Sequence, residues 1–308
     1  MRVAITQLIE ELSDTRRRLS HGRLLQLDHV SVPECDELRL RWPNLPKDRR
    51  LDIIRALADL TESAPDLNFD AIFLIALDDE DENVRAAAVE GLWENEERST
   101  MGRLLQLLRT DESAIVRAAA ARGLRAFALL AELDRFRPAD LTALDTALRD
   151  SLTDEFEEIP VRARAMETLG VRSRPWVPDL IEWAYRHDES LMRVAALHAM
   201  GESCDTRWLP RVIEHLSDPE PAMRFEAATA AGSIADPSAV PGLLPLLDDR
   251  DSEVQEAAIA ALGEIGGERA RRALRERAAS RDARIAAAAR DALAVLALAD
   301  AEIGLPDA

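Results

Sequence analysis

Apolar side chains in the second half of this sequence follow a short helical pattern that recurs every 31 residues. We call one copy of this pattern a phrase. When the residue after the first apolar position is numbered zero, positions −1 and +7 are apolar, position +3 is alanine and position +6 is small. Positions −1, +3 and +7 lie on one side of an α-helix, so each phrase predicts an amphipathic helix with a buried stripe. The phrases begin at Val161, Met192, Met223, Val254 and Ile285.

A second, shorter helix is predicted before each phrase, as residues 238–247 precede the helix expected over residues 253–263. Self-similarity with a period of roughly 20–50 residues is typical of a repeat solenoid, in which each repeat buries its stripe against its neighbours. Four phrases end on a glycine, which we expect to close the helix in a left-handed conformation. These glycines are Gly170, Gly201, Gly232 and Gly263.

The same phrase extends towards the N-terminus with looser spacing, at steps of 35 and 32 residues. A longer step of 45 residues, which ends at Arg162, predicts an insertion near residues 127–140. We therefore expect a capping helix and connector over residues 1–31, because a terminal repeat must end the core with a polar outer face. The solenoid itself is expected over residues 32–308.

Three features of the phrase resemble HEAT-like repeats, in particular the short type found in phycobilisome lyases and many bacterial scaffold proteins. They are the aspartate-rich turn between helices, as at residues 78–81 and 248–249, the arginine at position zero, and the run Ala-Ala-x-x-x-Leu-Gly. The resemblance covers residues 34–297. It implies an all-α fold, a right-handed α-solenoid of seven to eight two-helix HEAT-like repeats.

The resemblance further implies a structural role for the position-zero arginines. In HEAT arrays the turn aspartate and this arginine often pair between adjacent repeats and form an internal ladder. Gln255 and Ala286 occupy position zero in the last two phrases, so the ladder is expected to fade towards the C-terminus. The arginines with this implied role are Arg85, Arg117, Arg162, Arg193 and Arg224.

The net charge of −19 is informative about the kind of partner but says little about the fold. A surface that follows a phosphate backbone needs clustered basic side chains, and the nearest approach to one is Arg16, Arg17 and Arg18 with Arg23. The sequence therefore argues against nucleic-acid binding. It favours a protein partner with a cationic surface, bound by a monomeric chain.

Two cysteines, Cys35 and Cys204, lie 169 positions apart, and we expect both to be reduced and mostly buried thiols. The N-terminal residues lack the apolar core of a signal peptide, and no run of about 20 apolar residues could span a membrane. The expected location is the cytoplasm.

No constellation of catalytic residues emerges from the sequence. There is no glycine-rich phosphate loop, no His-Glu-x-x-His zinc motif and no pair of cysteines with metal-ligand spacing. HEAT-like deoxyhypusine hydroxylases carry iron on repeated His-Glu pairs, but none of the five histidines here is followed by glutamate. We therefore predict a non-catalytic protein with no cofactor and no metal.

We predict a protein-interaction scaffold or adaptor that binds its partner on the concave solenoid surface, which successive second helices line. With positions −1, +3 and +7 buried, positions +1, +2 and +5 face outward, and an exposed aromatic side chain there is a candidate anchor. Trp183 is added from a first helix because its register-mates Glu214 and Pro245 are not core residue types. The candidate partner-binding residues are Arg122, Arg164, Glu167, His198, Phe225, Glu226 and Trp183.

Two other functions stay open on the sequence alone. One is a phycobilin lyase-like subunit that attaches or detaches an open-chain tetrapyrrole, although no bilin-handling motif is evident. The other is a HEAT-like DNA glycosylase, which needs a basic groove with aromatic side chains. The acidic charge balance argues against the glycosylase.

Overall fold

The computed structural model describes residues 4–64 and 66–303, and all regular secondary structure in these residues is helical. The fold is therefore all-α, as the sequence predicts. The chain divides into two compact units, Met1–Ala165 and Met166–Ala308, and the division falls within helix α10 (Ile159–Leu169). None of the described helices is both long and apolar enough to cross a lipid bilayer.

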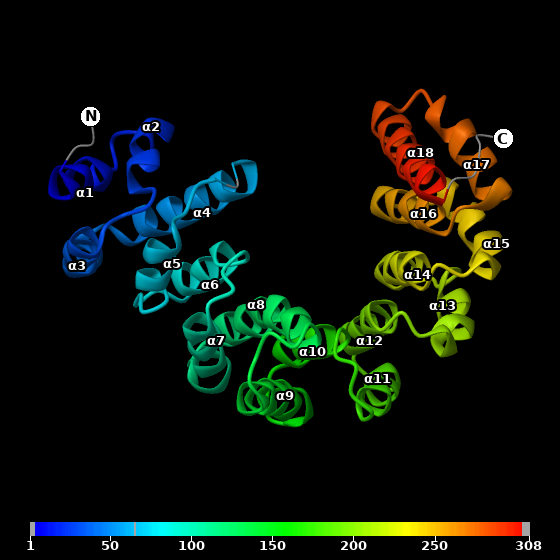
Figure 1. Cartoon of the computed structure of the whole chain (residues 1–308), viewed down its shortest axis with the longest axis horizontal. Coiled ribbons are helices and arrows are strands. Elements are labelled where there is room, and N and C mark those ends of the chain that lie inside the picture. The colour runs from blue at the N-terminus through cyan, green and yellow to red at the C-terminus, as the bar shows by residue number, and fades with distance from the viewer. Residues whose placement is uncertain (1–3, 65, 304–308) are drawn as a thin grey trace. The chain divides into compact units, whose positions relative to one another are not determined.

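The first unit consists of paired helices preceded by two further helices, α1 and α2 (Figure 1). Its elements before α10 are α1 (Ile5–Ser13), α2 (His21–Leu24), α3 (Val32–Arg41), α4 (Lys47–Ser63), α5 (Asp70–Ala76), α6 (Glu82–Gly91), α7 (Arg98–Thr110), α8 (Ala114–Glu132) and α9 (Pro138–Thr153), with 3-10 turns at Leu25–Leu27 and Trp42–Asn44. We call the second helix of each pair a B helix. The B helices α4, α6 and α8 pack side by side, and α5 and α7 pack against α6 and α8.

The second unit repeats this arrangement more regularly (Figure 1). Its elements after α10 are α11 (Val177–Tyr185), α12 (Ser190–Glu202), α13 (Leu209–His215), α14 (Pro221–Ile234), α15 (Val240–Leu243), α16 (Ser252–Ile265), α17 (Gly267–Ala278) and α18 (Ala283–Ile303), with 3-10 turns at Thr206–Trp208, Pro237–Ala239 and Leu244–Asp248. The B helices α12, α14, α16 and α18 form one row of neighbours. Each of them packs against the helix that precedes it in the chain.

The predicted apolar stripe of the B helices is buried. In α12, Met192, Ala196 and Met200 at positions −1, +3 and +7 are completely inaccessible to solvent. The equivalent residues of α10, α14 and α16 are buried as well. The exception is Leu293 of α18, which is half-buried.

The prediction that the phrase glycines close their helices in a left-handed conformation is wrong. Helices α12, α14 and α16 continue past Gly201, Gly232 and Gly263, and positive φ angles among the described glycines occur at Gly266 and Gly267. The phrase glycines do not use their conformational freedom, so another property must explain them.

That property is the absence of a side chain where two B helices approach closely. A Cβ atom on Gly201 would lie 2.7 Å from the Cα atom of Ala230 on the next B helix. A Cβ atom on Gly232 would lie 2.9 Å from Cα of Ala261. Both alanines occupy position +6. The backbones of the two helices approach so closely that a Cβ atom at the glycine position would lie nearer to the alanine than real Cβ atoms do, and glycine avoids this clash.

Residues 127–140 do not form a separate element. They contain the end of α8, a connection and the start of α9, so part of the extra length goes into α8, which has 19 residues against 10 in α6. Phe127 is buried, and its ring centroid lies 6.1 Å from that of Phe136 in the connection.

The expectation of two mostly buried thiols is wrong for Cys204, which is exposed, while Cys35 is half-buried. Cys204 lies two residues after the end of α12 and has a φ of 48°, so it is in the turn that leaves the helix rather than on the buried stripe. Burial of the Cys35 thiol raises its pKa.

Candidate functional site

Most of the predicted site residues lie on the outward side of the B helices. Position +5 is exposed on six B helices and half-buried on the other two, where it is Glu167 and His198. In the second unit the outward positions of α12, α14, α16 and α18 belong to adjacent helices. We call this row the B-helix face of the second unit.

His198 on α12 is surrounded by three glutamates, Glu226 on α14, Glu202 on α12 and Glu167 on α10. Its Nδ1 atom lies 3.1 Å from Oε2 of Glu226 on α14, and its Nε2 atom lies 3.7 Å from Oε1 of Glu202. Burial lowers the pKa of His198, but the hydrogen bond with Glu226 and the negative charges of Glu226, Glu167 and Glu202 outweigh burial, so the pKa lies above its ordinary value. The structure thus brings the predicted residues Glu167, His198 and Glu226 into one electrostatic group.

A hollow of about 430 Å³ opens beside this group, next to the half-buried ring of Phe225. Phe225 and Val194 both occupy position +1 of their helices and supply part of the apolar lining. The charged lining consists of carboxylates alone, those of Glu226, Asp251 and Glu253. We call this the Phe225 hollow.

A second hollow of about 410 Å³ lies between α16 and α18, and we call it the α16–α18 groove. Its lining is mostly apolar and includes the small residues Ala260, Gly263 and Ala288. The carboxyl group of Glu264 is partly desolvated here although the residue as a whole is exposed, and this desolvation raises the pKa of Glu264. The other acidic residues that line the groove are Glu256 and Asp291.

No arginine, lysine or histidine lines either hollow. Some of the carboxylates are already neutralised, since Glu226 pairs with His198 and Glu256 lies 3.0 Å from Nε of Arg284. Others have no hydrogen bond or ion pair from their carboxylate to any described side chain. These carboxylates are Glu253, Glu264 and Asp291.

Three predicted residues lie away from the two hollows. Arg122 is exposed on α8 and Arg164 is half-buried on α10, both in the first unit. Trp183 lies on α11, which is not a B helix, and is 38% exposed with its ring edge-on to His187 at 5.7 Å.

The position-zero arginines point towards the turns instead of the B-helix face. Arg85 donates from Nη1 to the backbone carbonyls of Asp79 and Glu80, at 2.8 and 3.2 Å. Its Nε and Nη2 atoms donate to the carboxylate of Asp111 in the next turn along the chain, at 2.9 and 2.8 Å. Two-pronged bonds of this kind fix geometry as well as charge.

The same arrangement recurs at two other arginines. Arg224 contacts Asp249 with Nε and Nη2 at 2.7 Å each. Arg117 contacts Glu157 at 2.9 and 2.8 Å, so a glutamate replaces the aspartate in that turn. Each arginine therefore joins its own turn to the following one.

Arg193 departs from the pattern. Its Nη1 atom donates to the carbonyls of His187 and Asp188 at 3.0 and 2.7 Å, and no described carboxylate pairs with it. The turn aspartate in the next register, Asp218, is 2.8 Å from Nδ1 of His215. For Arg162, Nε donates to the carbonyl of Leu152 at 3.0 Å.

None of the candidate residues named from the sequence lines the α16–α18 groove, and two of its exposed residues, Glu264 and Val295, fall outside the outward positions +1, +2 and +5. Both occupy position +9, just beyond the phrase as it was defined. Position +9 lies on the same side of a helix as positions +2 and +5. One more helical turn of the same pattern would have found them. Nowhere in residues 4–64 and 66–303 do three or more histidine, cysteine, aspartate or glutamate side chains form a group that could hold a metal ion.

Comparison with curated proteins found no match to this sequence. Among solved structures, yeast importin-β is similar with a TM-score of 0.53 and 14% identity, over 95% of this chain and 46% of importin-β. The Escherichia coli protein YibA aligns at 19% identity, over 78% of this chain and 96% of YibA, with a TM-score of 0.45. Human deoxyhypusine hydroxylase aligns at 18% identity, over 85% and 95% of the two chains, with a TM-score of 0.37. At these identities the likeness concerns the fold alone.

A family model gives the more specific result. The model of HEAT repeats matches residues 70–156 and 209–294, which together make up more than half of the chain. The first match covers α5 to α9 and the second covers most of α13 to α18, and the matched residues include Arg85, Arg117 and Arg224 of the position-zero arginines. The chain belongs to the HEAT-repeat family.

Proposed function

We propose that this chain is a protein-interaction scaffold without catalytic activity, and that it binds its partner on the B-helix face of the second unit. The observation that carries this proposal is the pair of hollows on that face, each with apolar lining and a rim of carboxylates. Val295 and Leu298 of α18 add exposed apolar surface nearby, at 54% and 69% exposure. Exposed apolar patches with polar rims are typical of protein-binding sites.

The charges on the rims favour a cationic partner. Glu253, Glu264 and Asp291 have carboxylates without a partner in the described chain, so arginine or lysine side chains of a bound protein could pair with them. An apolar side chain of the partner that enters the groove would increase the affinity. The carboxylates on the rim would increase the association rate and the specificity.

Close packing of the B helices suits this function. The glycine and alanine backbones that meet between α12, α14 and α16 leave little freedom for these helices to slide. A surface that is already ordered before binding loses less conformational entropy when the partner docks. Arg122 and Arg164 in the first unit and Trp183 on α11 stay separate candidate contacts, which the two hollows do not include.

The experiment is affinity capture from extracts of the native cell at moderate salt, with identification of bound proteins by mass spectrometry. Two variants disturb the hollows: Ala260→Arg fills the α16–α18 groove with a positive charge, and Phe225→Ala removes the ring from the other hollow. Ala279→Arg, at an exposed position after α17 and outside both hollows, is the matched control.

We expect the wild-type chain and Ala279→Arg to retain one protein in stoichiometric amount, and Ala260→Arg and Phe225→Ala to lose it while they keep their helical circular dichroism. If all four proteins retained the partner equally, the partner would bind outside this face. Recovery of a tetrapyrrole-carrying protein or of nucleic acid would contradict the scaffold proposal and favour one of the alternatives.

A further inference from the structure

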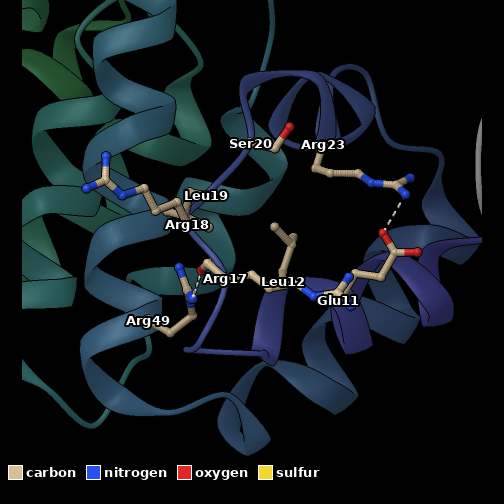
Figure 2. Close-up of a pocket in the computed structure, with 8 residues that line it drawn as sticks. All are labelled: Glu11, Leu12, Arg17, Arg18, Leu19, Ser20, Arg23 and Arg49. Atoms are coloured by element: carbon tan, nitrogen blue, oxygen red, sulfur yellow. Dashed lines mark hydrogen bonds and ion pairs between the residues drawn. The ribbon is translucent and has the colours of Figure 1, made fainter.

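The first unit has a hollow of the opposite charge at its N-terminal end. Its volume is about 160 Å³, and four arginines line it, Arg17, Arg18, Arg23 and Arg49, against a single carboxylate, that of Glu11 (Figure 2). In a chain with a net charge of −19, such a local excess of positive charge needs a physical reason. We call this feature the arginine hollow.

Arg49, on α4, is the most unusual of the four. Only 6% of the residue is exposed, and its Nη2 atom donates to the backbone carbonyls of Asp14 and Arg17 at 2.7 and 2.6 Å. Its Nε atom is buried and has no acceptor, and no carboxylate of the described chain pairs with the guanidinium. A buried charge without a counter-ion and a buried donor without an acceptor are both costly.

The adjacent arginine shows what a neutralised buried guanidinium looks like in the same helix. Arg50 is 2% exposed, and its Nε atom forms an ion pair with the carboxylate of Asp79 at 2.9 Å, although the geometry there is not that of a hydrogen bond. Its Nη2 atom lies 2.7 Å from the carboxylate of Glu80. Arg50 therefore has two counter-ions from the next turn, whereas Arg49 has none, and Arg49 is the one that lines a hollow.

The other arginines leave positive charge available around Arg49. Arg23 is neutralised by Glu11, with Nη2 2.8 Å from Oε2, and Figure 2 shows this pair on one side of the hollow. Arg17 has a looser contact, with Nε 3.4 Å from a carboxylate oxygen of Asp14. Arg18 is exposed and has no ion pair with a described residue, and its side chain extends away from the Arg23–Glu11 pair in Figure 2.

We propose that the arginine hollow binds a phosphate group. Arg49 would be the buried anchor, whose charge gains a counter-ion, and the exposed side chains of Arg17 and Arg18 would close over the ligand. Guanidinium groups suit this task because their planar donors match the oxygens of a phosphate. The volume of about 160 Å³ leaves room for the five heavy atoms of the ion.

This site is independent of the proposed protein-binding face, which lies in the second unit. Its effect would be local, because Arg49 also binds the backbone of the segment that connects α1 to α2. A phosphate that neutralises Arg49 would therefore stabilise the packing of that segment on α4.

The test is calorimetric titration of the full chain with inorganic phosphate, in chloride buffer of constant ionic strength. We expect a dissociation constant on the order of 1 mM for the wild-type chain. Arg17→Gln and Arg18→Gln are each expected to weaken binding about tenfold, because each removes a charge-assisted hydrogen bond. Arg16→Gln is the matched control, since Arg16 is adjacent, 94% exposed and outside the lining.

Binding by Arg16→Gln should stay within about twofold of wild type, because salt screens an exposed charge that does not touch the ligand. Arg49→Met should abolish binding, and if that variant does not fold, the Arg17 and Arg18 variants decide the question. Equal weakening in the Arg16, Arg17 and Arg18 variants would show diffuse attraction and overturn the proposal, as would the absence of phosphate binding.

Two further titrations distinguish the sources of the phosphate group. Phosphoserine is the probe for a phosphomonoester, and phosphatidylcholine vesicles that contain phosphatidic acid are the probe for a lipid headgroup. Tighter binding of either probe than of inorganic phosphate, lost in Arg18→Gln, supports the site and names its ligand class.

Discussion

The two units hold neighbouring B helices together by different means. In the second unit, a glycine of one B helix meets the position +6 alanine of the next, and this contact recurs with the 31-residue period. The pairs are Gly170–Ala199, Gly201–Ala230, Gly232–Ala261 and Gly263–Ala292. In the first unit, Gly91 and Gly123 face the side chains of Phe73 and Val89 instead. Its turns are joined by ion pairs of Arg50, Arg85 and Arg117 with carboxylates, a kind of contact that the second unit keeps at Arg224 with Asp249.

This difference accompanies the more regular spacing of the repeats in the second unit. A backbone-to-backbone contact tolerates little change in distance, so every repeat that uses it must present the same residues at the same spacing. Long arginine side chains can bridge turns at different separations, and the first unit accordingly has steps of 35, 32 and 45 residues. Mutations at the two kinds of contact should therefore have different consequences in the two units.

The largest effect is expected where a buried ion pair is broken in the first unit. Arg85→Met leaves the carboxylate of Asp111, which is 7% exposed, without its counter-ion, and such changes typically cost about 3–5 kcal/mol. Arg193→Met in the second unit removes contacts to carbonyls only and should cost about 1 kcal/mol. Urea unfolding followed by circular dichroism measures both, and equal losses would show that the carboxylate contributes nothing.

The next effect is expected at the glycine contacts of the second unit. Gly201→Ala places a Cβ atom 2.7 Å from the backbone of Ala230, and overpacking of this kind costs about 1–3 kcal/mol. Gly102→Ala on α7 is the control, because nothing lies within 4 Å of the new Cβ atom, and alanine there should stabilise the helix by about 1 kcal/mol. The same sign for both variants in urea unfolding would contradict the close-approach explanation.

A smaller effect should follow acidification. Hydrogen bonds from Arg224 hold the pKa of Asp249 below its ordinary value. The carboxylate therefore contributes stability above the ordinary pKa of about 4, and this contribution is lost as the pH falls through the lowered pKa of the folded state. Thermal unfolding from pH 6 to pH 2 should show a shallower loss for Asp249→Asn than for wild type. Asp291→Asn, at an exposed position without an ion pair, should keep the wild-type slope.

The smallest effect is expected near neutral pH and only in the second unit. The glutamates around His198 raise its pKa above the ordinary value of about 6.5, so the protonated ring contributes stability below that pH. The contribution is lost as the pH rises through the raised pKa. His198→Gln should remove this weak dependence between pH 6 and pH 9, whereas His21→Gln, at an exposed position, should leave it unchanged. Identical pH profiles for all three proteins would contradict the assignment.

Much of the fold could be predicted, because the 31-residue repeat and the helical spacing of its apolar residues indicate paired amphipathic helices. Val161, Met192 and Val254 share one register and are all buried, as a helical stripe requires. The glycines were harder to interpret, because the same residue type serves both helix ends and close helix contacts. Only the distance from Gly201 to Ala230 distinguishes these roles, and that distance joins two different repeats.

The candidate site could be predicted only in part. His198 and Glu226 were found because outward positions follow from the buried stripe, but their mutual contact depends on the lateral offset between α12 and α14. Glu264 and Val295 were not predicted because the phrase ends at position +8, whereas both residues lie at position +9, on the next helical turn. The arginine hollow was visible in the sequence only as Arg16–Arg18 with Arg23, since the buried anchor Arg49 lies on another helix.

The sequence by itself determined that this protein is an array of amphipathic helix pairs, because helical periodicity and repeat length are local properties that neighbouring residues encode. It also determined which side of each B helix is buried. The tertiary structure alone decided which carboxylate neutralises which arginine, which glycines touch a neighbouring backbone and where hollows remain between helices. These features depend on distances between residues about 25 to 40 positions apart, and such distances are set only when the helices pack.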